Sequence, residues 1–304
     1  MKRKKLSVLI ITYNQEEYIS KTLDSILNQK HNYEYEIVIG EDCSKDNTRK
    51  IIQDYFNKFP TIIKPIYNVV NLGLIKNYFT TLAACSGELI MECAGDDYWL
   101  DDKVSQQIEF MDKNPMIGMC YGQALCFINS RNTFEKKAIG KRKESFSDFI
   151  LSNEVPAPTV CYRREIMFDY IKKINPLSKK WHIEDLPQWL WFSKHSKIAF
   201  LEKPLAVYRL MEKSCSHFDN LDEDIEYLDN VRDIKLFFSD TEEERNLINQ
   251  LYYSDLANLY SNHMDLQNYR KYLRLSGTKH AKKRLIQSFI PFFLTLKHII
   301  SNNR

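Results

Sequence analysis

Two adjacent acids, Asp96 and Asp97, follow a short apolar stretch at residues 88–93 that is typical of a buried strand. Carboxylate oxygens are good ligands for Mg²⁺ and Mn²⁺, and water or diphosphate oxygens can fill the remaining positions on such a cation. Without a cation, the two carboxylates would repel a phosphorylated ligand. The pair therefore predicts a divalent-cation site beside a phosphate group, and the structural alternative is a solvated turn.

The elements that must position this pair alternate in type along the first 115 residues. Short apolar runs alternate with stretches of helical spacing, which predicts β-α-β-α-β connections and a mostly parallel sheet with right-handed crossovers. The expected strands are 6–11, 36–40, 62–67 and 88–93, and the expected helices are 19–27, 48–59, 73–85 and 103–114.

Ligands of such sheets bind beyond the carboxyl ends of the strands. This rule directs attention to Thr12, Tyr13 and Asn14 after the first strand, and to the segment 41–44, which contains Asp42, after the second. The alternatives are ordinary strand-end residues for Thr12 and Tyr13 and an Asx turn for Asp42.

The second half of the chain is expected to mix strands and helices before it becomes helical. Strands are predicted at 117–128, 156–162 and 198–208, a charged exposed loop at 131–144, and a tryptophan-rich helix at 186–195. Trp189 and Trp191 in that helix are more typical of a core than of a sugar-binding platform. From Asp222 the pattern is helical, with a capping box at Ser239 and Glu242 and a helix end at Gly277.

Glycine-rich nucleotide-binding loops are absent from the sequence. A dinucleotide fingerprint would need three spaced glycines after the first strand, and a P-loop would need a Gly-Lys pair. The six residues from Thr12 onwards, Thr-Tyr-Asn-Gln-Glu-Glu, contain no glycine. A nucleotidyltransferase, which would be expected to carry such a loop, is therefore a weak alternative.

Charge is distributed unevenly along the chain. The whole chain carries +3, whereas residues 271–304 hold eight Lys or Arg and no acid, so the first 270 residues carry −5. This excludes a general nucleic-acid-binding body. The apolar and basic pattern of 282–300 predicts a helix that lies on an anionic membrane surface, and docking onto the rest of the chain is the alternative, since Pro291 would kink it.

Composition places the chain among ordinary globular proteins, with 44% hydrophobic and 27% charged residues. Seven cysteines without a Cys-x-x-Cys pair suit a reducing compartment. The apolar stretch 285–300 is interrupted and shorter than the ~20 residues that span a bilayer, and the basic start lacks the cleavage site of a signal peptide. We expect a cytoplasmic protein that can associate peripherally with the inner face of the membrane.

Five motifs in order resemble glycosyltransferase family 2, and the resemblance covers about residues 5–215. It implies a GT-A fold, which is a Rossmann-like α/β domain with a mostly parallel sheet flanked by helices. The motifs are Ser-Val-Leu-Ile-Ile-Thr-Tyr-Asn from Ser7, Glu-Asp-Cys-Ser-Lys-Asp-Asn-Thr from Glu41, Asn-Leu-Gly from Asn71, Gly-Asp-Asp-Tyr-Trp from Gly95, and Glu184-Asp185.

The resemblance implies a set of donor-binding residues. Thr12 and Tyr13 would contact the nucleotide, and Asp42 would accept a hydrogen bond from the N–H of uracil. Lys76 lies where a basic residue near the phosphates is common in the family. The resemblance at Asp42 alone implies a UDP-sugar as the donor.

The resemblance also implies the catalytic centre. Asp96 matches the metal-binding acid for Mn²⁺ or Mg²⁺, Asp97 is a neighbouring acid that contacts the ribose or supports the metal site, and Asp185 resembles the base of inverting members. For Asp185 the structural alternative is a helix N-cap. The chain departs from the family at Ala94, where the first acid of an Asp-x-Asp motif is expected, and at Met211, where many members carry a histidine.

The function implied is inverting transfer of a sugar to a saccharide or lipid-linked glycan in surface polysaccharide assembly. Residues 1–215 would form the catalytic domain, and 216–304 a helical region with the basic tail. A nucleotide-sugar-binding scaffold that lost turnover with Ala94 and Met211 is the alternative.

Overall fold

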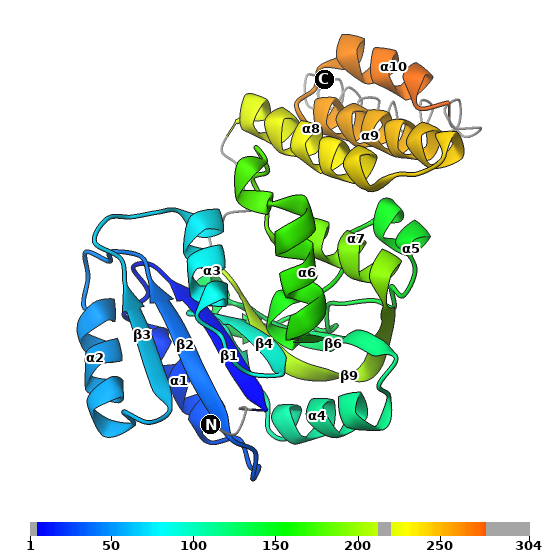
Figure 1. Cartoon of the computed structure of the whole chain (residues 1–304). Helices are drawn as coiled ribbons and strands as arrows, with labels where there is room; N and C mark the ends of the chain where they lie inside the picture. Colours follow the sequence, from blue (N-terminus) through cyan, green and yellow to red (C-terminus); the bar gives the residue numbers. More distant parts are fainter. Residues whose placement is uncertain (1–4, 212–219, 278–304) are drawn as a thin grey trace, which may run out of the picture. The chain divides into compact units, whose positions relative to one another are not determined.

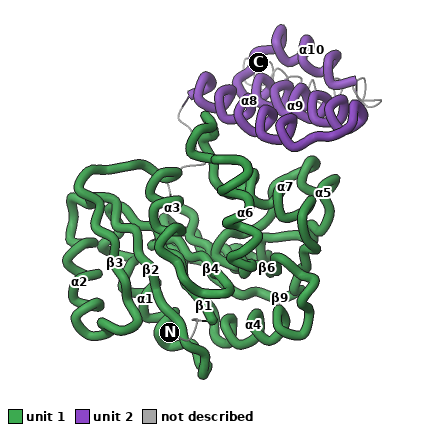
Figure 2. The backbone as a smooth tube through the Cα atoms, viewed as in Figure 1, with its two compact units in different colours: residues 1–214 green, residues 215–304 purple. Residues whose placement is uncertain are grey.

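The computed structural model describes residues 5–211 and 220–277 of the chain (Figure 1). Two compact units divide it, residues 1–214 and 215–304 (Figure 2). The residues that carry the predicted membrane-surface helix, 282–300, lie outside the described part, as does His217, a distant substitute for the histidine missing at Met211.

Within residues 5–211 the strands form a nine-stranded sheet in the order β3-β2-β1-β4-β8-β6-β9-β5, with β7 paired to β6. The strands are β1 (Leu6–Thr12), β2 (Tyr35–Glu41), β3 (Ile63–Tyr67), β4 (Leu89–Ala94), β5 (Tyr98–Trp99), β6 (Ile117–Ile128), β7 (Thr133–Phe134), β8 (Cys161–Arg163) and β9 (Lys197–Leu210).

The half of the sheet formed by β3, β2, β1 and β4 is parallel, as the alternation of strands and helices predicts. Its register brings the carboxyl ends together, because Thr12 pairs with Glu41 on one side and Ile11 pairs with Ala94 on the other. Antiparallel pairs join β8 to β4 and β6, whereas β6 and β9 run parallel. The α/β class and the mostly parallel sheet are confirmed.

Helices cover both faces of this sheet. Residues of α1, α2 and α4 share one hydrophobic cluster with Val8, Met91 and Cys93, whereas α3 packs near β1 and β2. Because strand side chains alternate between faces, Glu92 points away from that cluster. The helices are α1 (Ile19–Leu27), α2 (Thr48–Lys58), α3 (Leu74–Ala83), α4 (Lys103–Lys113), α5 (Phe146–Leu151), α6 (Arg164–Ile174) and α7 (Asp185–His195).

Several local expectations are wrong in the second half of this unit. The strand predicted at 156–162 is a 3-10 turn, Ala157–Thr159, followed by the three-residue β8, because Pro156 and Pro158 remove two ladder donors. The segment 131–144 is not all loop, since it contains β7 and a bridge between Ala124 and Ile139. Helices α5 and α6 were not predicted.

The second unit contains α8 (Leu221–Phe238), α9 (Glu242–Asn262) and α10 (Leu266–Leu275) in its described part. The capping box is at Thr241 and Glu244, not at Ser239 and Glu242, because Ser239 closes α8 by donating to Leu236. Gly277 follows α10 with a φ of 61°, the left-handed conformation of a helix end. Within residues 5–211 and 220–277, no helix is both long enough and apolar enough to cross a bilayer.

Candidate active site

The ends of β1 and β2 are joined by hydrogen bonds between the two loops that follow them. The Asp42 N–H donates to the Thr12 carbonyl at 3.0 Å, and the Asn14 N–H donates to Ser44 Oγ at 2.9 Å. The Lys45 N–H returns a bond to Asn14 Oδ1 at 2.8 Å. Thr12 is buried, whereas the Tyr13 side chain is 39% exposed and can contact a ligand.

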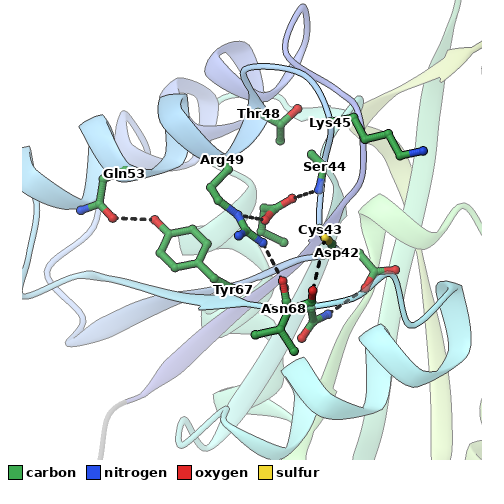
Figure 3. Close-up of polar contacts among 12 residues, drawn as sticks. Asp42, Cys43, Ser44, Lys45, Thr48, Arg49, Gln53, Tyr67 and Asn68 are labelled. Carbon is green, nitrogen blue, oxygen red and sulfur yellow. Dashed lines mark hydrogen bonds and ion pairs between the residues drawn. The ribbon is translucent and has the colours of Figure 1, made fainter.

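An ion pair beneath the second loop fixes its course. The fully buried Glu41 accepts from the Ser44 N–H at 2.6 Å and from Arg49 Nε at 2.5 Å. Arg49 continues to the Asn68 carbonyl at 2.7 Å and lies over the Tyr67 ring (Figure 3). Sequence reasoning missed this role of Glu41 and Arg49, because neither residue type nor spacing shows which acid pairs with which base.

Asp42 is anchored to the chain through three hydrogen bonds. Its Oδ1 accepts from Asn68 Nδ2 and from the Leu72 N–H, both at 2.8 Å, and its Oδ2 accepts from the Gly73 N–H at 2.9 Å. A carboxylate offers about four lone-pair positions, so one remains on Oδ2. Asp42 can therefore accept one further N–H while its side chain stays in place.

Asn77 connects this anchor to the sheet. Its Oδ1 accepts from Asn68 Nδ2 at 3.0 Å, and its Nδ2 donates to the Gly40 carbonyl at 3.0 Å. A Cβ on Gly40 would lie 1.9 Å from Thr81 Oγ1, so only glycine fits there. Lys76, which precedes Asn77 in the chain, is exposed and lies in the first turn of α3.

Asp96 and Asp97 lie in a tight turn after β4, and Arg209 of β9 fixes both. The Arg209 N–H donates to Asp97 Oδ1 at 2.8 Å, and its Nε donates to the Asp96 carbonyl at 2.9 Å. The Arg209 guanidinium also bonds Asn129 and lies over the Tyr18 ring. Sequence reasoning missed this role of Arg209, because no spacing rule joins residues so far apart in the chain.

The chemistry of this turn fits a divalent cation. Burial raises the pKa of Asp96, and burial together with the Asp96 charge raises the pKa of Asp97 well above its ordinary value. A bound cation would remove that cost by stabilising both carboxylates. The described residues contain no group of three or more His, Cys, Asp or Glu arranged to hold a metal, so water and diphosphate would have to complete the coordination. Ala94 and Met211 supply no ligand atom of the kinds Mg²⁺ prefers.

Asp185 is the first residue of α7, so the N-cap alternative is wrong: the N-cap position belongs to Glu184. Asp185 Oδ2 accepts from Asn153 Nδ2 at 2.9 Å, and Oδ1 accepts from the Leu186 N–H. Burial raises the pKa of Glu184 to about 8, and the charge of Asp185 contributes to this shift. Burial also raises the pKa of Asp185, whereas the hydrogen bonds from Asn153 and Leu186 lower it.

Tyr208 of β9 connects the two acidic groups electrostatically. Burial raises the pKa of its phenol to about 12, and the charges of Asp97, Asp96 and Asp185 all add to the shift. The phenol thus lies within electrostatic reach of the predicted metal site and of Asp185. The sequence predicted residues of both kinds, and the fold brings them to one end of the sheet.

Two other features do not belong to this site. Trp189 and Trp191 are buried in the core, as their helical spacing favours, and Trp191 stacks on His195. A hollow of about 480 Å³ lies between α2 and the edge strand β3, lined by residues such as Gln53, Phe56 and Pro65. It contains none of the predicted site residues.

Comparisons with known proteins agree with this arrangement. The family model "Glycosyl transferase family 2" matches residues 7–171. An uncharacterized protein of Mycobacterium tuberculosis is 31% identical over 207 residues, which cover 67% of this chain but only 58% of that protein. A putative teichuronic acid biosynthesis glycosyltransferase, TuaG of Bacillus subtilis, is 29% identical over 212 residues, covering 69% of this chain and 81% of TuaG.

A third relative is WfgD of Escherichia coli, a UDP-Glc:alpha-D-GlcNAc-diphosphoundecaprenol beta-1,3-glucosyltransferase. It is 28% identical over 214 residues, covering 69% of this chain and 79% of WfgD.

Among solved structures, Staphylococcus aureus TarS 1–349 in complex with UDP-GlcNAc shares the fold with a TM-score of 0.64 at 21% identity, over 89% of this chain and 79% of TarS. The mannosyltransferase PcManGT of Pyrobaculum calidifontis, in complex with GDP-Man and Mn²⁺, gives 0.60 at 14% identity, over 94% and 79%. Since the family model covers more than half of its 304 residues, the chain belongs to glycosyltransferase family 2 and has the GT-A fold.

Proposed function

We propose that the chain transfers a sugar from a nucleotide-diphospho-sugar to a saccharide hydroxyl, with inversion at the anomeric carbon. The observation that carries the proposal is that β9 meets both groups: its Arg209 holds the Asp96–Asp97 turn, and α7, which begins at Asp185, packs against the same strand. A leaving-group site and a base site close to one another are what a single displacement requires. Residues 1–215 would be the catalytic domain, and 216–304 an accessory helical region.

The donor is proposed to be UDP-linked. The remaining lone pair on Asp42 Oδ2 is suited to the N–H of uracil, because a carboxylate accepts hydrogen bonds and cannot donate one to the corresponding ring nitrogen of cytosine. Thr12 and Tyr13 would contact the nucleotide, and Lys76 would face its phosphates. TarS has been crystallised with UDP and with UDP-GlcNAc, and the name of WfgD gives UDP-Glc as its donor, which supports this choice.

Mn²⁺ or Mg²⁺ is proposed to bind at Asp96, with Asp97 beside it. When bound, the cation would stabilise the negative charge of the departing nucleoside diphosphate. The chain's own part is to hold the turn in place: the Arg209 backbone N–H donates to the Asp97 carboxylate, and the Arg209 guanidinium donates to the Asp96 backbone carbonyl. The PcManGT complex contains Mn²⁺, in agreement with this proposal.

Asp185 is proposed as the general base. Its carboxylate takes the proton of the acceptor hydroxyl while that oxygen forms a bond to the anomeric carbon. The bond from this carbon to the diphosphate oxygen breaks, and the diphosphate leaves with the electron pair. Attack opposite the leaving group inverts the anomeric centre. Asn153 orients the carboxylate by donating to Oδ2.

The acceptor is proposed to be a glycan or lipid-linked glycan of a bacterial surface polysaccharide. The names of TuaG and WfgD support this class. A cytoplasmic location against the inner face of the membrane, with the basic segment 271–304 on anionic lipid, is part of the same proposal.

Thermal unfolding of the full chain with UDP, GDP, CDP or dTDP, each with Mn²⁺ and with chelator, tests the donor site without an acceptor. A ligand that binds only the folded state stabilises it by about 2.7 kcal/mol at a hundredfold excess over its Kd. We expect a metal-dependent shift for UDP that is lost in Asp96→Ala.

Release of UDP from UDP-glucose or UDP-GlcNAc in the presence of Mn²⁺ then separates an enzyme from a scaffold. A chain that binds UDP but never releases it from a donor sugar would be the scaffold that Ala94 and Met211 suggest. If none of the four nucleotides raises the midpoint of thermal unfolding, the donor-site proposal is contradicted.

A further inference from the structure

A buried carboxylate outside the proposed reaction lies on the same side of the sheet as α7. Glu92 of β4 is 7% exposed, and its Oε1 accepts from the Tyr162 hydroxyl of β8 at 2.6 Å. The Tyr78 hydroxyl of α3 donates to the same oxygen. Three elements far apart in the sequence therefore meet at one carboxylate.

Gln188 extends this network into α7. Its Oε1 lies 3.0 Å from the Tyr78 hydroxyl as an acceptor, a position that a half-turn of the amide would give to Nε2, and Gln188 is fully buried. It stands three residues after Asp185, so the two side chains share one face of the helix. The first turn of α7, which carries Asp185, is thus tied to α3 and β4 through a single amide.

Hydrogen accounting couples the charge of Glu92 to this amide. The Tyr78 hydroxyl has one hydrogen, and it donates this hydrogen to Glu92 in a hydrogen bond when Glu92 is ionised. The Tyr78 oxygen then has only lone pairs left for Gln188, so the Gln188 nitrogen must face it. That orientation also gives a partner to Gln188 Nε2, which otherwise has none within the described residues. An ionised Glu92 therefore completes the network.

Charged and titratable groups face Glu92 from four elements. Burial raises the pKa of Glu92 to about 7, the two tyrosines lower it, the Asp185 charge raises it and Lys103 of α4 lowers it. The Glu92 charge also raises the pKa of Glu184, the N-cap residue of α7. The groups that face Glu92 are Tyr78, Tyr162, Lys103, Glu184 and Asp185.

We propose that Glu92 is a positioning residue for the base: through Tyr78 and Gln188 it holds the first turn of α7, which carries Asp185. This inference rests on the proposed role of Asp185.

A pH profile of turnover tests whether the charge of Glu92 completes the network. With UDP-glucose or UDP-GlcNAc, Mn²⁺ and the full chain, we expect wild-type kcat for UDP release to rise about threefold through pH 7, as Glu92 ionises and the network that holds Asp185 is completed. Glu92→Gln keeps the shape and removes the charge, so this step should vanish while the Kd for UDP is unchanged. A step that persists in Glu92→Gln overturns this role of Glu92.

Gln188→Met tests the mechanical part and does not depend on whether Glu92→Gln folds. It cuts the tether without changing a charge, so kcat should fall and lose its step near pH 7, while the Kd for UDP remains. Unchanged kcat in Gln188→Met would show that the tether does not position Asp185.

Asp185→Asn separates failure of this inference from failure of the proposed function. If Asp185→Asn releases UDP at the wild-type rate, Asp185 is not the base, and this inference is wrong together with the proposed mechanism. Loss of release in Asp185→Asn, together with wild-type behaviour of both network variants, refutes the inference alone.

Discussion

The two ends of the candidate site are built differently. At the donor end, Asp42 accepts three hydrogen bonds and Glu41 accepts two, and these bonds fix the loops around them. At the base end, three buried atoms have no hydrogen-bond partner among the described residues, namely Tyr170 Oη, Gln188 Nε2 and Trp189 Nε1. The carboxylates at the donor end are hydrogen-bonded to their own loops, whereas α6 and α7 contain buried polar atoms that have no partner among the described residues.

The carboxylates of the two ends also differ in electrostatics. Asp46, in the donor loop, has a lowered pKa, because hydrogen bonds from Thr48 and from backbone N–H groups outweigh the effect of its burial. Glu92, Glu184 and Asp185 at the base end have raised pKa values, chiefly because they are buried or partly buried. The loop after β2 thus stabilises the charge of Asp46, whereas burial penalises charge at the base end, as it does at Asp96 and Asp97. Variants at the two ends should therefore fail in different ways.

The largest effect is expected for Asp185→Asn. General-base catalysis typically contributes 10²–10⁴-fold, so UDP release should fall by about that factor while UDP affinity stays within about twofold. Initial rates and a UDP titration measure the two quantities. Asp169→Asn, in the exposed Asp169–Lys173 pair of α6, is the matched control and should retain wild-type rates. If Asp185→Asn turns over at the wild-type rate, Asp185 is not the general base.

Glu41→Gln should come second, and it should affect folding more than chemistry. Glu41 is fully buried, and removing its charge leaves Arg49 without its ion-pair partner, so we expect a loss of about 2–3 kcal/mol in the free energy of unfolding. Urea denaturation measures this loss. Glu109→Gln, in the exposed Glu109–Lys113 pair of α4, should change it by less than about 0.5 kcal/mol. Equal losses in both variants would contradict the picture of a prebuilt donor end.

The dependence of stability on pH is the third effect. A carboxyl whose pKa is higher in the folded state than in the unfolded state binds more protons when folded, so folding weakens as pH rises between the two values. For Glu92 this window runs from about 4.5 to about 7. We expect the free energy of unfolding to fall by about 1–3 kcal/mol across it, and Glu92→Gln to flatten this part of the curve.

Denaturation midpoints at several pH values, measured on the wild type and on Glu92→Gln in parallel, give the comparison. Superimposable curves for the two proteins would show that Glu92 does not titrate in this range.

The sequence was sufficient for features that depend on local pattern. The apolar runs located β1 to β4, and the rule for parallel sheets placed Thr12, Asp42 and Asp96 at one edge. The pairing of Glu41 with Arg49 depends on how a loop folds back, and no spacing rule predicts it. The capping box was misplaced by two residues because both Ser239 and Thr241 have a hydroxyl and an acid three positions later.

Long-range contacts account for the other omissions. Arg209 reaches the Asp96–Asp97 turn across 112 or more residues, and Tyr162 reaches Glu92 across 70. A sequence pattern shows that such residues are polar within apolar surroundings, but only the fold shows which of them meet. The base end depends on contacts of this kind more than the donor end does, so less of it could be predicted.

The smallest effect is expected for Asp42→Asn, and it concerns specificity. With its oxygen at the Oδ1 position the amide still accepts from Leu72 and Asn68, so the loop should stay folded, but its NH₂ group would then face both the Gly73 N–H and the ligand. We expect UDP to bind about tenfold more weakly, whereas CDP, whose ring nitrogen accepts a hydrogen bond, should lose less or gain. Titration of both nucleotides with Mn²⁺ measures the ratio. Because Asp42 is anchored by its own chain, the substitution acts on the one lone pair left for the nucleobase. An unchanged ratio of UDP to CDP affinity would mean that other residues recognise the nucleobase.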